Sequence, residues 1–331
     1  TVRTIKLTIA YDGTAYAGWQ YQPDRMSVQE TLETALKKAT GEQIRVLASG
    51  RTDAGVHALG QVVGFRTECK LPPDALLRAI NANLPPDVAA LDAAEVPDGF
   101  HPISHARRKR YRYVIHDGPV RDVFSRNHAW HYRYGRLDAE AMDRAAAALL
   151  GTHDFSSFES AGAPRESSVR TIFAIGVERC RAGQGRGLGD GDGGTGDEGE
   201  GLEDGGEGLG IRRCGNAGMR ECGKWKRPAT AIAGDMETPR DCDRGGTSQA
   251  SIVAQPCAEK GGNPQSDFII IEVEADGFLY NMVRAIVGTL VEVGRGKRPV
   301  SWPGEVLRAA DRRAAGPTAP PQGLFLVNVE Y

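Results

Sequence analysis

The feature that most constrains the fold is a glycine- and acid-rich segment in the middle of the chain. Half of residues 183–210 are glycine, and Asp and Glu supply most of the charge between them. Such a sequence buries too little apolar surface to offset the entropy of ordering it, so we predict a disordered insertion over residues 180–266. A calcium-binding solenoid is the sharper alternative, but the nine-residue period with a large apolar residue in each repeat is absent.

The sequence on either side of this insertion is patterned. Strands are predicted where apolar residues alternate, and helices where they recur at helical spacing or follow capping signals. The predicted strands are 5–9, 44–47, 61–65, 105–116, 268–273 and 324–329, and the predicted helices are 28–39, 72–84, 138–150 and 282–293. Strands and helices mix without strict βαβ alternation, which favours an α+β fold with largely antiparallel sheet. We divide the chain into an N-terminal half (1–104), a C-terminal half (105–179 plus 267–331) and the insertion.

Composition excludes some classes of protein. No apolar run approaches the roughly 20 residues that a membrane helix needs, and Thr1–Lys6 has no apolar signal region, so we expect a cytoplasmic protein. The cysteines form no C-x-x-C pair, and all seven histidines precede residue 154, while five of the six cysteines follow it. A zinc site is therefore not expected, and the cysteines are read as free thiols in a reducing compartment.

Net charge is −2, which taken alone argues against a polyanion-binding protein. The distribution of charge says otherwise, because residues 107–112 place five cations around Tyr111. In a strand, Arg107, Lys109 and Tyr111 share one face, a combination that suits phosphate contact and base stacking. An exposed strand with solvated charges explains the same pattern.

A polar turn between two apolar strands holds the candidate catalytic residue. Asp53 stands with Arg51 between Gly50 and Gly55, where small residues allow a bulky ligand to approach. A carboxylate there serves as a nucleophile or a general base, although an aspartate that only caps a turn is the plain alternative. Farther along, Arg284 begins an otherwise apolar helix, so it requires an anionic partner, and Asp53 could serve.

Five motifs together resemble the tRNA pseudouridine synthase A family. They occur in family order across nearly all of the chain outside the insertion, which is far more specific than one short pattern. The motifs are Tyr11–Gln20 (YDGTAYAGWQ), Gly50–Ala58 (GRTDAGVHA), Ala106–Tyr113 (ARRKRYRY), Met282–Gly288 (MVRAIVG) and Ala319–Leu324 (APPQGL). The insertion is the one departure from the family pattern.

The resemblance implies a fold, a reaction and residue roles. It implies a pseudouridine-synthase-like α+β fold, with two similar halves of antiparallel sheet and helices around a central cleft. It implies an isomerase that converts uridine to pseudouridine on the 3′ side of the tRNA anticodon arm, as a homodimer without metal or cofactor. Asp53 matches the catalytic aspartate, Arg284 its ion-pair partner, Tyr111 the ring that stacks on the uracil, and Arg51 an arginine proposed to support nucleotide flipping.

Two rival functions are weighed against this one. A non-catalytic RNA-binding module explains the basic strand but gives no reason for a carboxylate beside a guanidinium. A metal-independent glycosidase usually requires two carboxylates across the bond, and none accompanies Asp53 in the matched motifs. For the insertion, a linker and a lineage-specific interaction arm both stay open.

Overall fold

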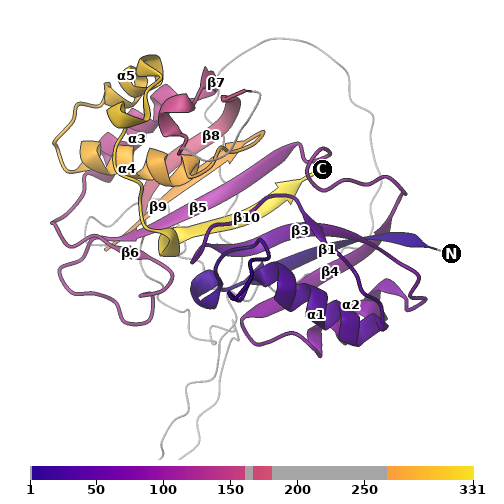
Figure 1. Ribbon diagram of the computed structural model, residues 1–331. Helices are drawn as coiled ribbons and strands as arrows, with labels where there is room; N and C mark the ends of the chain where they lie inside the picture. Colours follow the sequence, from indigo (N-terminus) through magenta and orange to yellow (C-terminus); the bar gives the residue numbers. More distant parts are fainter. Residues whose placement is uncertain (1, 161–166, 181–266) are drawn as a thin grey trace, which may run out of the picture. The chain divides into compact units, whose positions relative to one another are not determined.

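The described part of the chain is built on one mixed sheet. A computed structural model describes residues 2–160, 167–180 and 267–331, which belong to one compact unit. Within it, a ten-stranded sheet has the order β4-β1-β3-β10-β5-β9-β8-β7, with β2 beside β3 and β6 beside β5 (Figure 1). Neighbouring strands pair antiparallel, except for β10 with β3 and β6 with β5. The expected α+β fold with a mainly antiparallel sheet is confirmed, although the sheet is continuous from one half to the other.

The N-terminal half contains four strands and two helices. They are β1 (Arg3–Tyr11), β2 (Leu47–Ala48), β3 (His57–Thr67), β4 (Val88–Val96), α1 (Val28–Thr40) and α2 (Pro73–Asn81). The Ser27 side chain accepts a hydrogen bond from the Glu30 N–H, and Gly41 ends α1 in the left-handed conformation at φ 78°, as its sequence predicts. Between β1 and α1 lies the 3₁₀-helix η1 (Gly13–Ala15).

Before the last strand, the C-terminal half contains five strands and three α-helices. They are β5 (Arg108–His116), β6 (Trp130–His131), β7 (Gly151–Asp154), β8 (Val169–Cys180), β9 (Phe268–Ala275), α3 (Ala139–Ala146), α4 (Met282–Gly294) and α5 (Trp302–Ala309). Short 3₁₀-helices lie at η2 (Ala147–Leu149), η3 (Ser156–Phe158), η4 (Arg312–Ala314) and η5 (Pro321–Gly323). The last strand, β10 (Leu324–Glu330), joins the halves because it pairs with β3 on one side and β5 on the other.

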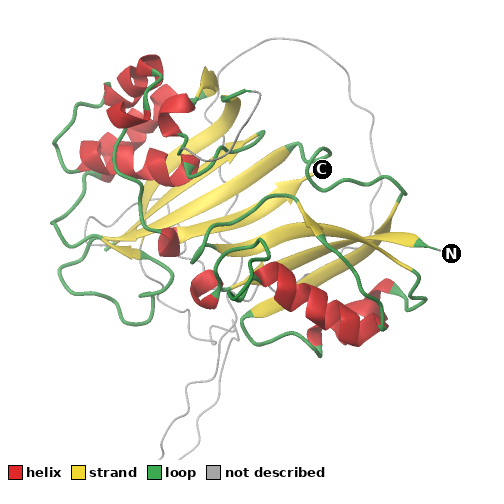
Figure 2. Cartoon of the chain, viewed as in Figure 1, coloured by secondary structure: helices red, strands yellow, loops and turns green. Residues whose placement is uncertain are grey.

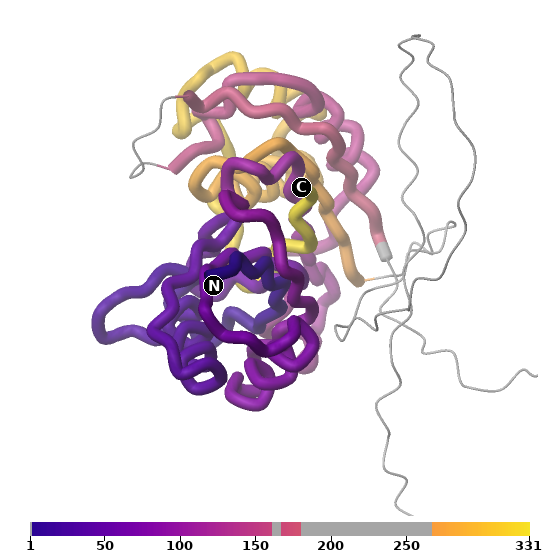
Figure 3. The backbone as a smooth tube through the Cα atoms, turned by 90° about the vertical axis from the view of Figure 1, so that its right-hand side faces the viewer, coloured from indigo at the N-terminus to yellow at the C-terminus, as the bar shows by residue number. Residues whose placement is uncertain are grey.

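One face of this sheet carries the core. The register pairs Tyr11 with Ala58, Ala58 with Leu326, and Leu326 with Tyr111, so these residues share a face. Their side chains belong to one buried cluster with Leu36 of α1 and residues of all the other α-helices. The helices form two groups, α1 and α2 over one end of the sheet and α3, α4 and α5 over the other (Figure 2). Figure 3 shows the same division from the side, with the N-terminal half in indigo and purple.

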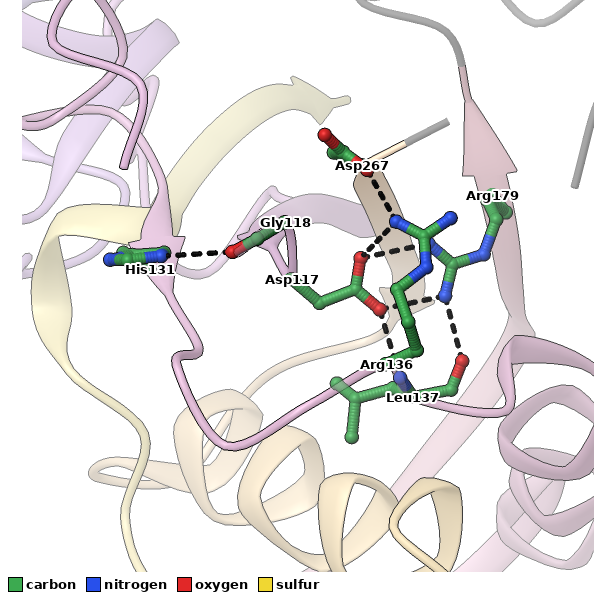
Figure 4. A network of polar contacts seen from close by, with 7 residues as sticks. All are labelled: Asp117, Gly118, His131, Arg136, Leu137, Arg179 and Asp267. Carbon is green, nitrogen blue, oxygen red and sulfur yellow. Dashed lines mark hydrogen bonds and ion pairs between the residues drawn. The ribbon is translucent and has the colours of Figure 1, made fainter. Parts of the chain in front are cut away.

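A buried carboxylate fixes the far end of the C-terminal half. Asp117 has no exposed side-chain surface and accepts two hydrogen bonds from Arg179, at 2.8 and 2.7 Å, and one from the Leu137 N–H, at 2.9 Å. Arg136 bonds both Asp117 and Asp267, which immediately precedes β9 (Figure 4). Two guanidinium groups thus join the ends of β5, β8 and β9 around one acid.

Some boundaries differ from those predicted. The strand predicted at 105–116 begins at Arg108, the helix predicted at 72–84 ends at Asn81, and the strand predicted at 44–47 is only β2. The predicted insertion lies outside the described residues except for Cys180, which ends β8. The two-half division at residue 104 stays a prediction. Among the described residues, no helix has both the length and the apolar character to cross a membrane.

A candidate active site around Asp53

Asp53 lies in the turn between β2 and β3, and residues of the first motif, Tyr11–Gln20, contact that turn. The Trp19 N–H donates to the Thr52 carbonyl at 2.9 Å, and the Tyr11 and Thr52 hydroxyls hydrogen bond at 2.8 Å. Gly18, at φ 101°, approaches so closely that an added Cβ would lie 2.7 Å from the Thr52 carbonyl oxygen. The glycine is therefore required both by its backbone conformation and by the space that the turn occupies.

Arg284 reaches Asp53 from the first turn of α4. Its Nη1 lies 3.2 Å from Asp53 Oδ2, and the two side chains are 16% and 31% exposed, so the pair is partly screened from water. Two further acceptors orient the guanidinium, because Nε donates to the Ala319 carbonyl at 2.7 Å and Nη1 to Asn281 Oδ1 at 2.8 Å. The structure therefore brings together the acid and the base that the sequence paired.

Asn281 contacts the site, and the sequence pattern does not single it out. It precedes α4 in the left-handed conformation, at φ 61°, which is unfavourable for a residue with a side chain. Its amide links Arg284 to the Ser160 hydroxyl, with Nδ2 donating to Ser160 Oγ at 3.2 Å. An Asn tolerates this conformation better than most residues, and strained backbone of this kind clusters at functional sites.

Burial and the neighbouring guanidinium act on the pKa of Asp53 in opposite senses. Burial raises the pKa, and the charge and hydrogen bond of Arg284 lower it, leaving the pKa above its ordinary value. The ion pair leads us to expect that Arg284 lowers the pKa of Asp53, and it does so. Partial desolvation outweighs this effect, so the net shift is upward.

Tyr111 projects from β5 into the same region. It is 9% exposed, and its ring meets the Phe278 ring edge to face with centroids 4.9 Å apart. Burial raises the pKa of Tyr111, and the charges of Tyr11 and Asp53 add to the shift. The phenol is therefore neutral near pH 7, which suits a stacking ring better than a general base.

The six predicted site residues differ in their exposure and in the contacts that their side chains make. Arg51 and Arg107 are exposed, and neither side chain makes a hydrogen bond or ion pair within residues 2–160, 167–180 and 267–331. Lys109 instead donates from Nζ to the Ser49 carbonyl at 2.7 Å. The structure thus groups Asp53, Arg284 and Tyr111, and sets Lys109 against the start of the same turn.

The remaining cations of the basic strand lie on its opposite face. Arg108 and Arg110 bond Glu274 at 3.0 and 2.8 Å, and Arg112 bonds Glu272 at 2.6 Å. These cross-strand pairs neutralise the three arginines. The sequence signal for them is the pair of acids Glu272 and Glu274 in the strand β9. The sequence reasoning did not use that signal.

A histidine cluster anchors the far end of the turn. His57, 1% exposed, accepts a hydrogen bond at Nδ1 from the Gly13 N–H at 3.0 Å, while its Nε2 lies 2.9 Å from the Asn127 carbonyl oxygen. Burial lowers the pKa of His57, which agrees with the neutral ring that these bonds describe. Ligand atoms of Asp12, His57 and His128 all lie within 4.8 Å of one another, the spacing of a possible metal site. Asp12 Oδ1 lies 3.1 Å from His57 Nδ1, and Asp12 Oδ2 lies 3.1 Å from His128 Nε2, so the three side chains pack closely at this end of the turn.

The chain is similar to known proteins of one family over most of its length. The family model described as tRNA pseudouridine synthase matches residues 7–103 and 145–331. The chain is 34% identical to tRNA pseudouridine synthase A of Thermoanaerobacter sp. (strain X514), over 100% of both chains. It is 37% identical to the protein of that name from Moorella thermoacetica, over 99% of both chains. It is 38% identical to the one from Halalkalibacterium halodurans, over 98% of this chain and 91% of the relative.

Proposed function

The chain belongs to the tRNA pseudouridine synthase family, and from this premise we propose that Asp53 is its nucleophile and that the target uridine lies in the anticodon arm. The chain is an isomerase that converts uridine to pseudouridine in tRNA. The observation that supports the role of Asp53 is its contact with Arg284, 3.2 Å away, in a turn bounded by Gly50 and Gly55. No metal or cofactor is proposed.

The reaction needs one carboxylate and a closed place for a detached base. The bond between N1 and C1′ breaks, the uracil turns, and a bond forms between C5 and C1′. N1 gains a proton and C5 loses one, so the product is an isomer of the substrate. A carboxylate supports these steps by adding to C1′ or to C6 of the uracil, and either route requires the uridine to leave its stack at a cost of a few kcal/mol.

Each of the neighbouring side chains has a proposed part in this reaction. Arg284 orients Asp53 and opposes the effect of burial on its pKa. Tyr111 stacks on the uracil, a role supported by its position on the helix-covered face of β5 and by its neutral phenol. Arg51 is an exposed cation in the turn of Asp53, and Arg107 is an exposed cation directly before β5; we assign them to contacts with the extruded nucleotide and the tRNA backbone.

Release of tritium from tRNA carrying 5-tritiated uridine tests the proposal, because isomerisation must expel the hydrogen at C5. Wild-type protein is expected to release the label, and Asp53→Asn to release none while still binding tRNA. The second candidate, a non-catalytic RNA-binding module, predicts binding without release by either protein. Sustained release by Asp53→Asn would falsify the assignment of the nucleophile while leaving the family's activity intact.

We further propose that the protein acts as a homodimer in the cytoplasm. Both follow from the family resemblance and from tRNA as substrate. Light scattering on the purified full chain tests the dimer, and a mass-spectrometric map of pseudouridine in treated tRNA tests the anticodon arm. A monomeric mass, or modification confined to another arm, contradicts the respective part.

A further inference from the structure

Lys109 is the candidate site residue whose surroundings differ most from its predicted role. Its sequence context predicts a phosphate contact, yet its Nζ donates to the Ser49 carbonyl at 2.7 Å. An added Cβ at Gly50 would lie 3.6 Å from the same nitrogen, so the ammonium group bonds Ser49 and lies beside Gly50. A hydrogen bond from an ammonium group is roughly twice as strong as one between neutral groups.

Other contacts at the start of the turn come from the strand that follows it. Gln61 of β3, fully buried, donates from Nε2 to the Gly50 carbonyl at 2.8 Å and accepts from Ser49 Oγ at 2.6 Å. These bonds fix the turn to the N-terminal half. Contacts with the C-terminal half, which supplies Tyr111, come from Arg284 at Asp53 and from Lys109 at Ser49.

The bond from Lys109 crosses between the halves. Lys109 and Tyr111 are two residues apart in β5, so they share a face of the strand at a spacing of about 7 Å. Ser49 and Asp53 are likewise joined by a short stretch of backbone, whose far end is held by Trp19 and Tyr11. The bond between Lys109 and Ser49 therefore helps to set the distance between the nucleophile's turn and the stacking ring, together with the contact of Arg284 to Asp53.

We propose that Lys109 is a positioning residue, which holds the backbone of Ser49 and Gly50 so that Asp53 and Tyr111 face the same uridine. This role rests on the proposed function of Asp53. A displacement of about 1 Å at a reacting group lowers turnover on the order of 100-fold, so loss of the bond from Lys109 is expected to act on kcat. It is not expected to act on tRNA affinity, which depends on phosphate contacts.

The substitution Lys109→Met separates positioning from phosphate contact, because it keeps the length and removes the charge. For positioning, we expect single-turnover kcat to fall by about 10- to 100-fold, with the Kd for tRNA and its salt dependence unchanged. For phosphate contact, the Kd rises and the slope of log K against log salt falls by about 1, while kcat is kept. That second result overturns the proposal.

Three further variants complete the design. Lys109→Arg keeps a charged donor and is expected to restore most of kcat, whereas a merely space-filling role predicts that Lys109→Met also keeps kcat. Lys38→Met, at an exposed position of α1, is the matched control for removal of a lysine. Lys109→Gln replaces Lys109→Met if that protein does not fold, with the same expected division between kcat and Kd. If Asp53→Asn is inactive and Lys109→Met is fully active, the positioning role alone fails.

Discussion

At the scale of single residues, the site is a balance between burial and charge at Asp53. Burial raises the pKa of this carboxyl, and Arg284 opposes the shift. Only the ionised carboxylate is a nucleophile, so activity should fall as pH drops through the pKa of Asp53. Arg284 thus widens the pH range over which the partly buried Asp53 remains ionised and can act as a nucleophile.

Replacing Arg284 by Gln is therefore expected to shift the pH profile. Without the positive charge, the ionised form is disfavoured further, the pKa rises, and the acid limb of kcat/KM moves to higher pH. Arg284→Lys keeps the charge and should shift the limb less. Measuring kcat/KM from pH 4 to 9 for the three proteins checks this, and coincident acid limbs would contradict the electrostatic role of Arg284.

Tyr111 is expected to act through its ring and not through its hydroxyl. The raised pKa of the phenol makes a phenolate base unfavourable near pH 7, whereas stacking needs only the ring. Tyr111→Phe should keep turnover within about tenfold, and Tyr111→Ala should lose it together with about 1–3 kcal/mol of base stacking. Tritium release by the three proteins is the measurement, and an inactive Tyr111→Phe would restore the hydroxyl as a participant.

At the scale of elements, the site depends on how closely α4 approaches the segment before β10. An added Cβ at Gly288 would lie 1.6 Å from the Pro317 carbonyl oxygen, and Gly316 faces the same helix backbone. The next residues of that segment supply the Ala319 carbonyl that holds Arg284. A glycine one turn along the helix therefore helps to set where the guanidinium lies.

Gly288→Ala is accordingly expected to disturb both stability and catalysis. Overpacking of this kind destabilises by about 1–3 kcal/mol or more, and here the displaced atoms are backbone. We expect a lower urea midpoint and a fall in kcat. Gly296→Ala is a control, because its Cβ meets nothing within 4 Å, although its φ of 70° carries a local penalty. An unchanged kcat in Gly288→Ala would mean that the packing of α4 at Gly288 does not affect the position of the site residues.

The elements that the sequence predicts best are those whose signals are local. A capping box and a final glycine locate α1, and a mostly apolar run locates α4. The sequence does not predict β4, which is rich in alanine, or β8, which adjoins the insertion. It also does not predict the short elements β6, β7 and α5. Within the site, the Asp53 and Arg284 pair follows from the need of a buried charge for a partner. The bonds from Lys109 to the Ser49 carbonyl and from Arg284 to the Ala319 carbonyl cannot be predicted in this way. No pattern of side chains in the sequence indicates which backbone oxygen will lie beside a given cation in the folded chain.

At the scale of the whole molecule, the acid Asp117 joins strands that are far apart in sequence. Burial raises its pKa, but its bonds to Arg179 and Leu137 and the nearby charge of Arg136 outweigh burial and leave the pKa lowered. A lowered pKa means that the ionised group stabilises the fold above the ordinary carboxyl pKa, and that this contribution is lost as pH falls through the folded value.

Asp117→Asn is therefore expected to destabilise the protein at neutral pH by about 3 kcal/mol, because two guanidinium groups lose their shared anion. The difference in the free energy of unfolding between Asp117→Asn and wild type should be largest at pH 7 and should shrink below about pH 4. Urea unfolding at pH 7 and at pH 3.5 measures both values. A difference that is equal at the two pH values would mean that shape and not charge makes Asp117 important.

The same network bears on whether the fold needs residues 183–262. The register of β8 with β9 runs to the pair Cys180 and Phe268, and the bonds of Arg179 and Asp267 to Asp117 and Arg136 hold the two strand ends together. A short connection can close such an antiparallel pair, and loop-closure entropy changes only slowly with length. Deleting residues 183–262 should leave the melting temperature and the tritium-release kcat close to those of the full chain. If the segment is an interaction arm for tRNA, the deletion will raise the Kd with kcat preserved, whereas a collapse of kcat and melting temperature together would show that the sheet relies on it.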